Sequence, residues 1–409
     1  MCKIKQFLSI KRNIYFIIFA NKTRLIKAMM KKFIFICLSI TCMLFSCENN
    51  SDNTKNNACV ENENLMKFTS YIDVTNYKSG YYVNISNPWN DKSLGEYYLY
   101  PDSLELPNEL ENKTVIRTPV KNVIAYSSTQ WSVFLEIGEI ERVKGILESN
   151  YTDNVEIKRL LAEKKIEDVG IETSLKTEIV INLHPDVILY TPYSTVPKTE
   201  IGELTGAVMF PFADYLENHP LGRAEWLKVI GFLTCREKDT DKWFDDIVSR
   251  YESLKNLCQN VENRPTVFSD LPFEGQWYLP GGASYIAQIF HDAGANYIWS
   301  DNNSTASLPV DAETVLSKAR DADFWRVMNS TNHKFTYEGL AAENELYTYF
   351  KAYKNRNIIV CDIRESGYFE KSEYEPDLLL KDFVYVFHPE MLENEDYTPK
   401  HFYKLRDEK

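Results

Sequence analysis

Short continuous apolar runs alternate with amphipathic segments from about residue 118 onward. Four runs have the length of buried strands: KNVIAYS (121–127), VKGIL (143–147), PDVILY (185–190) and AVMFPF (207–212). Apolar positions at helical spacing fill the segments between and after them, at 130–138, 174–183, 197–205 and 221–233. Because right-handed crossovers join strands that alternate with helices, we predict a parallel sheet covered by helices in residues 118–236.

The same alternation returns after Pro265. Strands are predicted at 265–271, 323–328 and 357–363, and helices at 283–293, 311–322, 337–349 and 377–392. Between the two halves, apolar residues keep helical spacing over 237–261, which would make a helix about 37 Å long. The sequence therefore predicts an α/β protein with an N-terminal lobe (118–236), a long linking helix (237–261) and a C-terminal lobe (262–409).

The N-terminal part has a different character. Two lysines precede an apolar run at 33–45 that is followed by Ser46 and Cys47, as in a signal peptide of a lipoprotein. We expect residues 1–46 to be removed, with translation starting at Met29 or Met30, and Cys47 to carry lipid that anchors the chain to a membrane. Residues 47–64 then form a flexible tether, and the Tyr-rich segment 65–117 is predicted to be a β-rich extension.

Composition and motifs exclude several classes of function. The formal net charge of −13 is unfavourable for binding nucleic acid. Neither the six histidines nor the cysteines show metal-ligand spacing, so no metal site is expected, and the cysteines after Cys47 are expected to be buried free thiols, with one disulfide as the alternative. No nucleophile elbow, Walker loop or dinucleotide fingerprint is present, so we expect no enzyme and no cofactor.

Candidate ligand contacts follow from the rule that ligands of open α/β sheets lie beyond the carboxyl ends of the strands. The loops predicted at those positions are rich in aromatic residues and carry a few charges; they span 127–131, 191–194, 214–223, 273–282 and 364–369. Such loops suit a bulky ligand such as an iron chelate, haem or cobalamin. For each aromatic side chain, a role in packing its loop remains the alternative. The predicted contacts are Ser128, Thr129, Trp131, Tyr193, Glu217, His219, Arg223, Trp277, Tyr278, Arg364 and Tyr368.

Residues 118–392 resemble a known family. The resemblance rests on VIAYSS (123–128), LEIG (135–138), VKG (143–145), EIVINLHPDVILY (178–190), ENHPLGRAEW (217–226), GGASYIAQIFHDAGANY (281–297) and PDLLLKDFVYVFHPE (376–390). In this order they are similar to the vitamin-B12- and iron-siderophore-binding receptors of ABC importers, the helical-backbone class (class III) of periplasmic binding proteins.

The resemblance implies two Rossmann-like lobes, a rigid helix between them and an interlobe cleft that captures the ligand. It also implies a monomer that delivers its ligand to an ABC permease and its ATPase. Glu200 or Glu203 would dock on the permease, whereas Ala283 stands where the second lobe of the family carries its docking glutamate. Two alternatives remain open: a surface lipoprotein that binds or senses a ligand without a transporter, and an exported enzyme that reuses the fold.

Overall fold

The computed structural model describes residues 63–90, 92–193, 200–331 and 334–406. The chain divides into two units, 1–61 and 62–409, and the fold described below is that of the second unit. The predicted signal peptide, the lipid attachment at Cys47 and nearly all of the tether lie outside the described residues. No helix of the described part is both long enough and apolar enough to cross a bilayer.

The extension, predicted to be β-rich, is a four-stranded sheet. Its strands are β1 (Ile72–Tyr77), β2 (Gly80–Ser86), β3 (Ser93–Pro101) and β4 (Val115–Thr118), in the order β1-β2-β3-β4. The first three strands pair antiparallel and β4 pairs parallel with β3. Alternate residues such as Val74, Val83, Ile85 and Leu99 are buried on one face, which is the pattern of a sheet packed on one side.

The N-terminal lobe contains the predicted parallel sheet. Its strands lie in the order β11-β10-β5-β6-β7. Their bounds are β5 (Val123–Ala125), β6 (Val143–Ile146), β7 (Glu167–Asp168), β10 (Val187–Tyr190) and β11 (Val208–Pro211). The helices of this lobe are α2 (Ser128–Glu136), α3 (Val155–Ala162), α4 (Thr177–Asn182) and α5 (Glu200–Thr205). Helix α4 begins later than predicted, because Ser174 pairs in a short antiparallel hairpin of β8 (Gly170–Ile171) and β9 (Ser174–Leu175).

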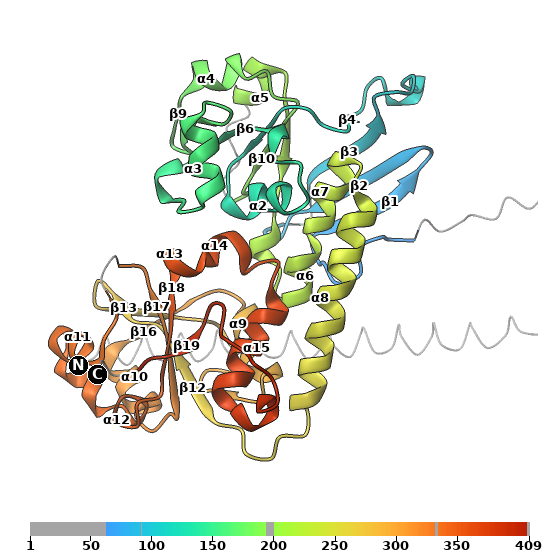
Figure 1. Cartoon of the computed structure of the whole chain (residues 1–409). Coiled ribbons are helices and arrows are strands. Elements are labelled where there is room, and N and C mark those ends of the chain that lie inside the picture. Colours follow the sequence, from blue (N-terminus) through green and yellow to red (C-terminus); the bar gives the residue numbers. More distant parts are fainter. Residues whose placement is uncertain (1–62, 91, 194–199, 332–333, 407–409) are drawn as a thin grey trace, which may run out of the picture. The chain divides into compact units, whose positions relative to one another are not determined.

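Three consecutive helices connect the lobes. The predicted helix 221–233 is two helices, α6 (Pro220–Glu225) and α7 (Leu227–Thr234), and the predicted linking helix is α8 (Glu237–Cys258). Helix α8, yellow in Figure 1, packs against α7 and against α15 (Pro376–Phe387) of the C-terminal lobe. An ion pair of 2.6 Å between Arg250 Nε and Asp377 Oδ2 joins α8 to α15. The long helix thereby contacts elements of both halves of the unit.

The C-terminal lobe has a second five-stranded sheet, in the order β15-β12-β17-β18-β19. Its strands are β12 (Thr266–Ser269), β15 (Asn296–Tyr297), β17 (Phe324–Asn329), β18 (Ile358–Asp362) and the antiparallel edge strand β19 (Tyr403–Lys404). Helices α9 (Tyr285–Asp292), α10 (Ala312–Ala319), α11 (Tyr337–Glu343), α12 (Lys351–Lys354) and α15 accompany it. The segment 273–282, predicted as a loop, instead contributes β14 (Gln276–Leu279) to a small sheet with β13 (Pro272–Phe273) and β16 (Leu308–Asp311).

Two buried carboxylates, Glu225 in α6 and Glu217 three residues before α6, fix the start of the extension. The backbone N–H groups of 67–69 donate to Glu225 at 2.7–3.2 Å, and those of 70–71 donate to Glu217 at 2.8–3.2 Å. The indole Nε1 of Trp226 also donates to Glu217, at 3.1 Å. Burial raises the pKa of both carboxyl groups, and these N–H donors act against that rise. A Cβ atom at Gly222 would lie 2.7 Å from the carbonyl oxygen of Phe68, so only glycine permits this close approach.

We predict that Glu225→Gln destabilises the protein by about 2 kcal/mol, because charge-assisted bonds from three backbone N–H groups are replaced by weaker neutral ones. Urea unfolding measures the change. Glu111→Gln is the matched control on the exposed surface of the extension, where a change within about 0.5 kcal/mol is expected. Equal effects of the two substitutions would contradict the anchoring role of Glu225.

Candidate ligand-binding site

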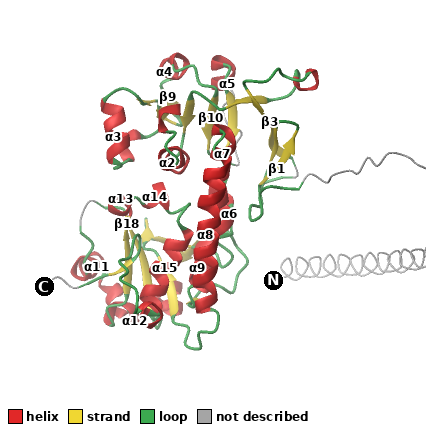
Figure 2. Cartoon of the chain, turned by 45° about the vertical axis from the view of Figure 1, so that its right-hand side comes forward, coloured by secondary structure: helices red, strands yellow, loops and turns green. Residues whose placement is uncertain are grey.

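The carboxyl ends of strands from both lobes are connected by one segment of the C-terminal lobe. After β18 the chain forms two short helices, α13 (Ile363–Ser366) and α14 (Tyr368–Lys371), and α14 packs against α2 of the N-terminal lobe. Figures 1 and 2 both show α13 and α14 beside α2. Helix α2 starts directly after β5, with Ser127 and Gln130 forming a capping box at its first turn. The candidate site is therefore the junction between the start of α2 and residues 364–373, which we call the latch.

Four residues of the latch make polar contacts with the N-terminal lobe. The Ser128 hydroxyl donates to the carbonyl oxygen of Phe369 at 2.9 Å, and Arg364 Nε lies 2.5 Å from Asp153 Oδ2. The Glu370 carboxylate accepts from the Thr152 hydroxyl at 2.9 Å and from the Asn154 amide at 3.1 Å. The contact between Arg223 and Glu373 is the most deeply buried. The latch thus holds the two lobes together through side chains of both.

Arg223 is the buried cation of this junction. Its Nη1 donates to both carboxylate oxygens of Glu373 at 2.8 Å, and its Nη2 donates to the carbonyl oxygen of Tyr215. Nε donates to the carbonyl oxygen of Glu217 at 3.3 Å, and the guanidinium lies 3.8 Å from the centroid of the Tyr285 ring. A planar guanidinium suits this combination of a bidentate carboxylate, backbone acceptors and an aromatic face.

Beside this ion pair lie two polar side chains that sequence analysis missed. Asp214 follows β11 and is 4% exposed, and Tyr374 follows the latch and is 2% exposed. Asp214 Oδ2 and the Tyr374 hydroxyl make no hydrogen bond of normal geometry, and each residue makes a weaker polar contact with the Thr129 side chain. Burial, and then the nearby Glu373 carboxylate, raise the pKa of Asp214 to about 7, against the opposite effect of Arg223.

The predicted ligand contacts fall into three groups. Ser128, Thr129, Arg223, Arg364 and Tyr368 gather at the junction, where the Tyr368 hydroxyl lies 2.8 Å from that of Tyr285. At the junction their polar groups contact one another or other groups of the protein. Their contact with a ligand stays a prediction.

The predicted aromatic lining is not assembled as expected. Trp131 and Trp277 are each 2% exposed and belong to the hydrophobic core. Trp277 packs against Phe268 and Trp325 because its side chain points to the covered face of β14. The neighbouring Tyr278 is 49% exposed, and Tyr193 is 52% exposed with its ring 6.0 Å from that of Tyr215. The indoles of Trp131 and Trp277 therefore pack in the core, which was the alternative interpretation.

Glu217 and His219 have structural roles in this arrangement. Glu217 holds the start of the extension, so its carboxylate is occupied by protein N–H groups rather than turned toward a ligand. His219 is the N-cap of α6: its Nδ1 accepts from the N–H of Leu221 at 3.2 Å, and its ring stacks on Phe68 at 5.6 Å. For Glu217 the expected ligand contact is corrected, because residues 67–71 dock on its carboxylate. For His219, helix capping was the alternative that the sequence favoured over a ligand contact.

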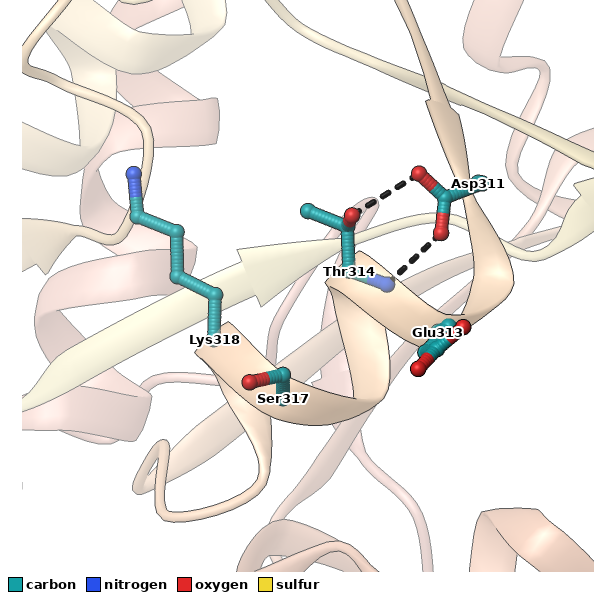
Figure 3. A pocket seen from close by; sticks show the side chains of 5 residues that line it. All are labelled: Asp311, Glu313, Thr314, Ser317 and Lys318. Atoms are coloured by element: carbon teal, nitrogen blue, oxygen red, sulfur yellow. Dashed lines mark hydrogen bonds between the residues drawn. The ribbon is translucent and has the colours of Figure 1, made fainter.

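A separate hollow of about 530 Å³ lies at the start of α10 (Figure 3). Asp311 caps this helix by accepting from the N–H and the hydroxyl of Thr314, each at 2.8 Å. Its lining is Asp311, Glu313, Thr314, Ser317 and Lys318, which all come from one helix and its cap. An open hollow along a single helix encloses no ligand, so we place the candidate site at the latch. Within the described ranges, no three His, Cys, Asp or Glu side chains gather as a metal ion would require.

We predict that Glu373→Gln weakens the junction, because it leaves the buried Arg223 guanidinium without its carboxylate. A loss of about 3 kcal/mol in the free energy of unfolding is expected, together with a larger radius of gyration in X-ray scattering as the lobes separate. Glu395→Gln breaks an exposed ion pair with Lys381 and is the control, with an expected change below about 1 kcal/mol. An unchanged scattering curve for Glu373→Gln would argue against the latch.

Asp214 also predicts a pH dependence. Its pKa is higher in the folded chain than in the unfolded chain, so between about pH 4 and 7 the folded state binds more protons. Stability from this group therefore falls as the pH rises through that range, by at most about 1.4 kcal/mol per pH unit. Unfolding curves at several pH values measure this change. The free energy of unfolding of the wild type, relative to that of Asp214→Asn, should fall as the pH rises from about 4 to 7. Parallel curves would contradict the assignment, because the two proteins share all other titrating groups.

Comparison with known proteins agrees with this architecture. The sequence profile of the family described as "Periplasmic binding protein" matches residues 123–364. An uncharacterized lipoprotein of Methanocaldococcus jannaschii is 29% identical over 392 residues, which cover 87% of this chain and 92% of the relative.

Solved structures share the fold at low identity. The structure of an ABC-type Fe3+-hydroxamate transport system from Saccharomonospora viridis aligns with a TM-score of 0.51 at 16% identity, covering 66% of this chain and 94% of that one. A periplasmic heme binding protein from Pseudomonas aeruginosa aligns with a TM-score of 0.51 at 14% identity, covering 66% of this chain and 93% of that one. Since the profile spans more than half of the sequence and the two lobes with their linking helix match the fold, this chain belongs to the periplasmic binding protein family, in its helical-backbone class.

Proposed function

We propose that this protein is the substrate-binding lipoprotein of an ABC importer, which captures an iron chelate (a siderophore complex or haem) or cobalamin between its lobes. The observation that carries the proposal is the junction itself. The carboxyl ends of strands from two α/β lobes meet there, and Arg223, Thr129 and Tyr368 come together from segments far apart in the sequence. Ligands of open α/β sheets bind at this place.

Capture requires the latch to separate from the N-terminal lobe, because its contacts fill the junction. Opening exposes Arg223, Glu373 and the hydroxyl groups of Tyr285 and Tyr368, which offer charge, hydrogen bonds and aromatic faces to a large ligand. Helix α8 packs against elements on both sides, so we expect a small closing motion about this helix rather than a wide rotation. The solved relatives named for Fe3+-hydroxamate transport and for heme binding support this class of ligand.

Anchoring and delivery complete the proposal. The relative named as a lipoprotein supports lipid attachment at Cys47 and a location in the cell envelope. For docking on the permease and its ATPase we propose the exposed residues Glu200 and Glu203 of α5. Ala283 precedes the N-cap of α9 in the second lobe and offers no carboxylate, so docking would depend on the N-terminal lobe. The same observation favours, as a second candidate, a surface lipoprotein that binds its ligand without a transporter.

Calorimetric titration of the purified full chain in detergent tests the proposal, with cobalamin, haemin, a ferric hydroxamate and a ferric catecholate as ligands. We expect one of them to bind at one site with micromolar or tighter affinity, and Arg223→Ala to weaken that binding at least about tenfold. Tyr349→Ala, at an exposed position of the C-terminal lobe outside the predicted contacts, is the control and should leave the affinity unchanged. The proposal fails if none of the four binds, or if Arg223→Ala binds as tightly as the wild type.

A further inference from the structure

The cluster under the latch is rich in hydrogen-bond acceptors. Asp214 Oδ2 and the Tyr374 hydroxyl, one from each lobe, are buried without a hydrogen bond of normal geometry. The Thr129 side chain makes a weaker polar contact with both residues, and its single hydroxyl proton can be donated to only one of them. Buried polar atoms are nearly always paired, and an unpaired one typically costs about 1–3 kcal/mol. An arrangement that keeps two of them at the proposed capture site indicates a missing partner.

The surrounding charges define the chemistry of that partner. Two carboxylates, Asp214 and Glu373, lie beside a single guanidinium, that of Arg223. The guanidinium directs its hydrogen bonds to Glu373 and to the backbone carbonyls of Tyr215 and Glu217 rather than to Asp214. A carboxylate brought to this place would be repelled by Asp214 and Glu373, whereas an N–H donor would satisfy Asp214 Oδ2 and the Tyr374 hydroxyl together.

We propose that Asp214, Tyr374 and Thr129 form a subsite for a nitrogen group that donates hydrogen bonds, a primary amide or an ammonium, and that the receptor thereby selects ligands with such an edge over ligands with a carboxylate edge. This inference rests on the proposed capture of a ligand at the junction and adds its selectivity. Among the candidate ligands, a corrinoid with amide side chains and a chelate with an ammonium tail fit the subsite. Haem, which presents two carboxylates, does not.

Matched ligands test the selectivity directly. One pair is cobinamide, whose side chains are amides, and cobyrinic acid, which has the same ring with carboxylic acids. The second pair is ferrioxamine B, which ends in an ammonium, and its N-succinyl derivative, which ends in a carboxylate. In titration calorimetry at pH 8 we expect the donor member of a pair that binds to bind at least about tenfold tighter. Asp214→Asn should reduce that ratio below about threefold, since the asparagine amide supplies its own donor.

Glu313→Gln is the control, because Glu313 is exposed on α10 away from the latch. A ratio near one in the wild type, a preference for the carboxylate member, or an unchanged ratio in Asp214→Asn would overturn the subsite. A ratio near one is also the result expected if an ordinary water molecule satisfies Asp214.

A second measurement separates this inference from the proposed function. If no member of either pair binds, the capture of such chelates fails, and small probes decide the subsite alone. Acetamide and methylammonium should raise the melting temperature of the wild type above that in equal sodium acetate, and Asp214→Asn should remove the difference. Equal melting temperatures in all three solutions would then overturn the subsite as well.

Discussion

The buried guanidinium of Arg223 is the constraint on which the rest of the unit depends. A cation taken out of water has to be paired, and Arg223 obtains its partners from both lobes: backbone carbonyls before α6 on one side, and Glu373 with the Tyr285 ring on the other. Its helix is only six residues long, yet the same short region holds the extension through Glu217 and Glu225. Extension, N-terminal lobe and C-terminal lobe are therefore positioned around one element.

The polar contacts of the latch allow this junction to open. Ion pairs and hydrogen bonds can exchange a protein partner for a ligand or for water, whereas a packed apolar interface cannot do so without a large loss of buried area. Residues 364–373 make ion pairs and hydrogen bonds with the N-terminal lobe, whereas α7 and α15 each pack along α8. A polar junction combined with a continuous helical connection suits a receptor that opens on one side. In our proposal, opening of the junction makes Asp214 Oδ2 and the Tyr374 hydroxyl accessible to a ligand.

Much of the fold could be predicted from the sequence, because buried parallel strands appear in it as continuous apolar runs. The runs 121–127, 185–190 and 207–212 contain β5, β10 and β11, and the long amphipathic segment contains α8. The errors come from local chemistry that an apolar pattern does not carry. Ser174 pairs in a hairpin instead of capping a helix, and residues 276–279 form a strand where the position between a strand and a helix suggested a loop.

The site was only half visible in the sequence. Thr129, Arg223 and Tyr368 were found because they lie in loops that follow strands, which is a local property. Glu373 and Tyr374 lie beyond the predicted loop 364–369. Asp214 lies in the predicted loop 214–223, but nothing in the local sequence distinguishes these three residues from solvated side chains. Glu217 shows the opposite failure: its charge suggested a ligand contact, whereas its partners are backbone N–H groups about 150 residues away. Burial and partners of polar residues depend on long-range contacts, which a single sequence does not specify.

Hydrogen–deuterium exchange of the full chain, with and without a saturating ligand, tests the central claim most directly. The account predicts that without ligand the latch and residues 127–131 and 212–216 exchange faster than the core strands β10 and β17, since polar junctions open more readily than apolar cores. A bound ligand should protect these three segments together and leave α10 unchanged. Protection at α10, or at one lobe alone, would contradict capture at the junction between the lobes.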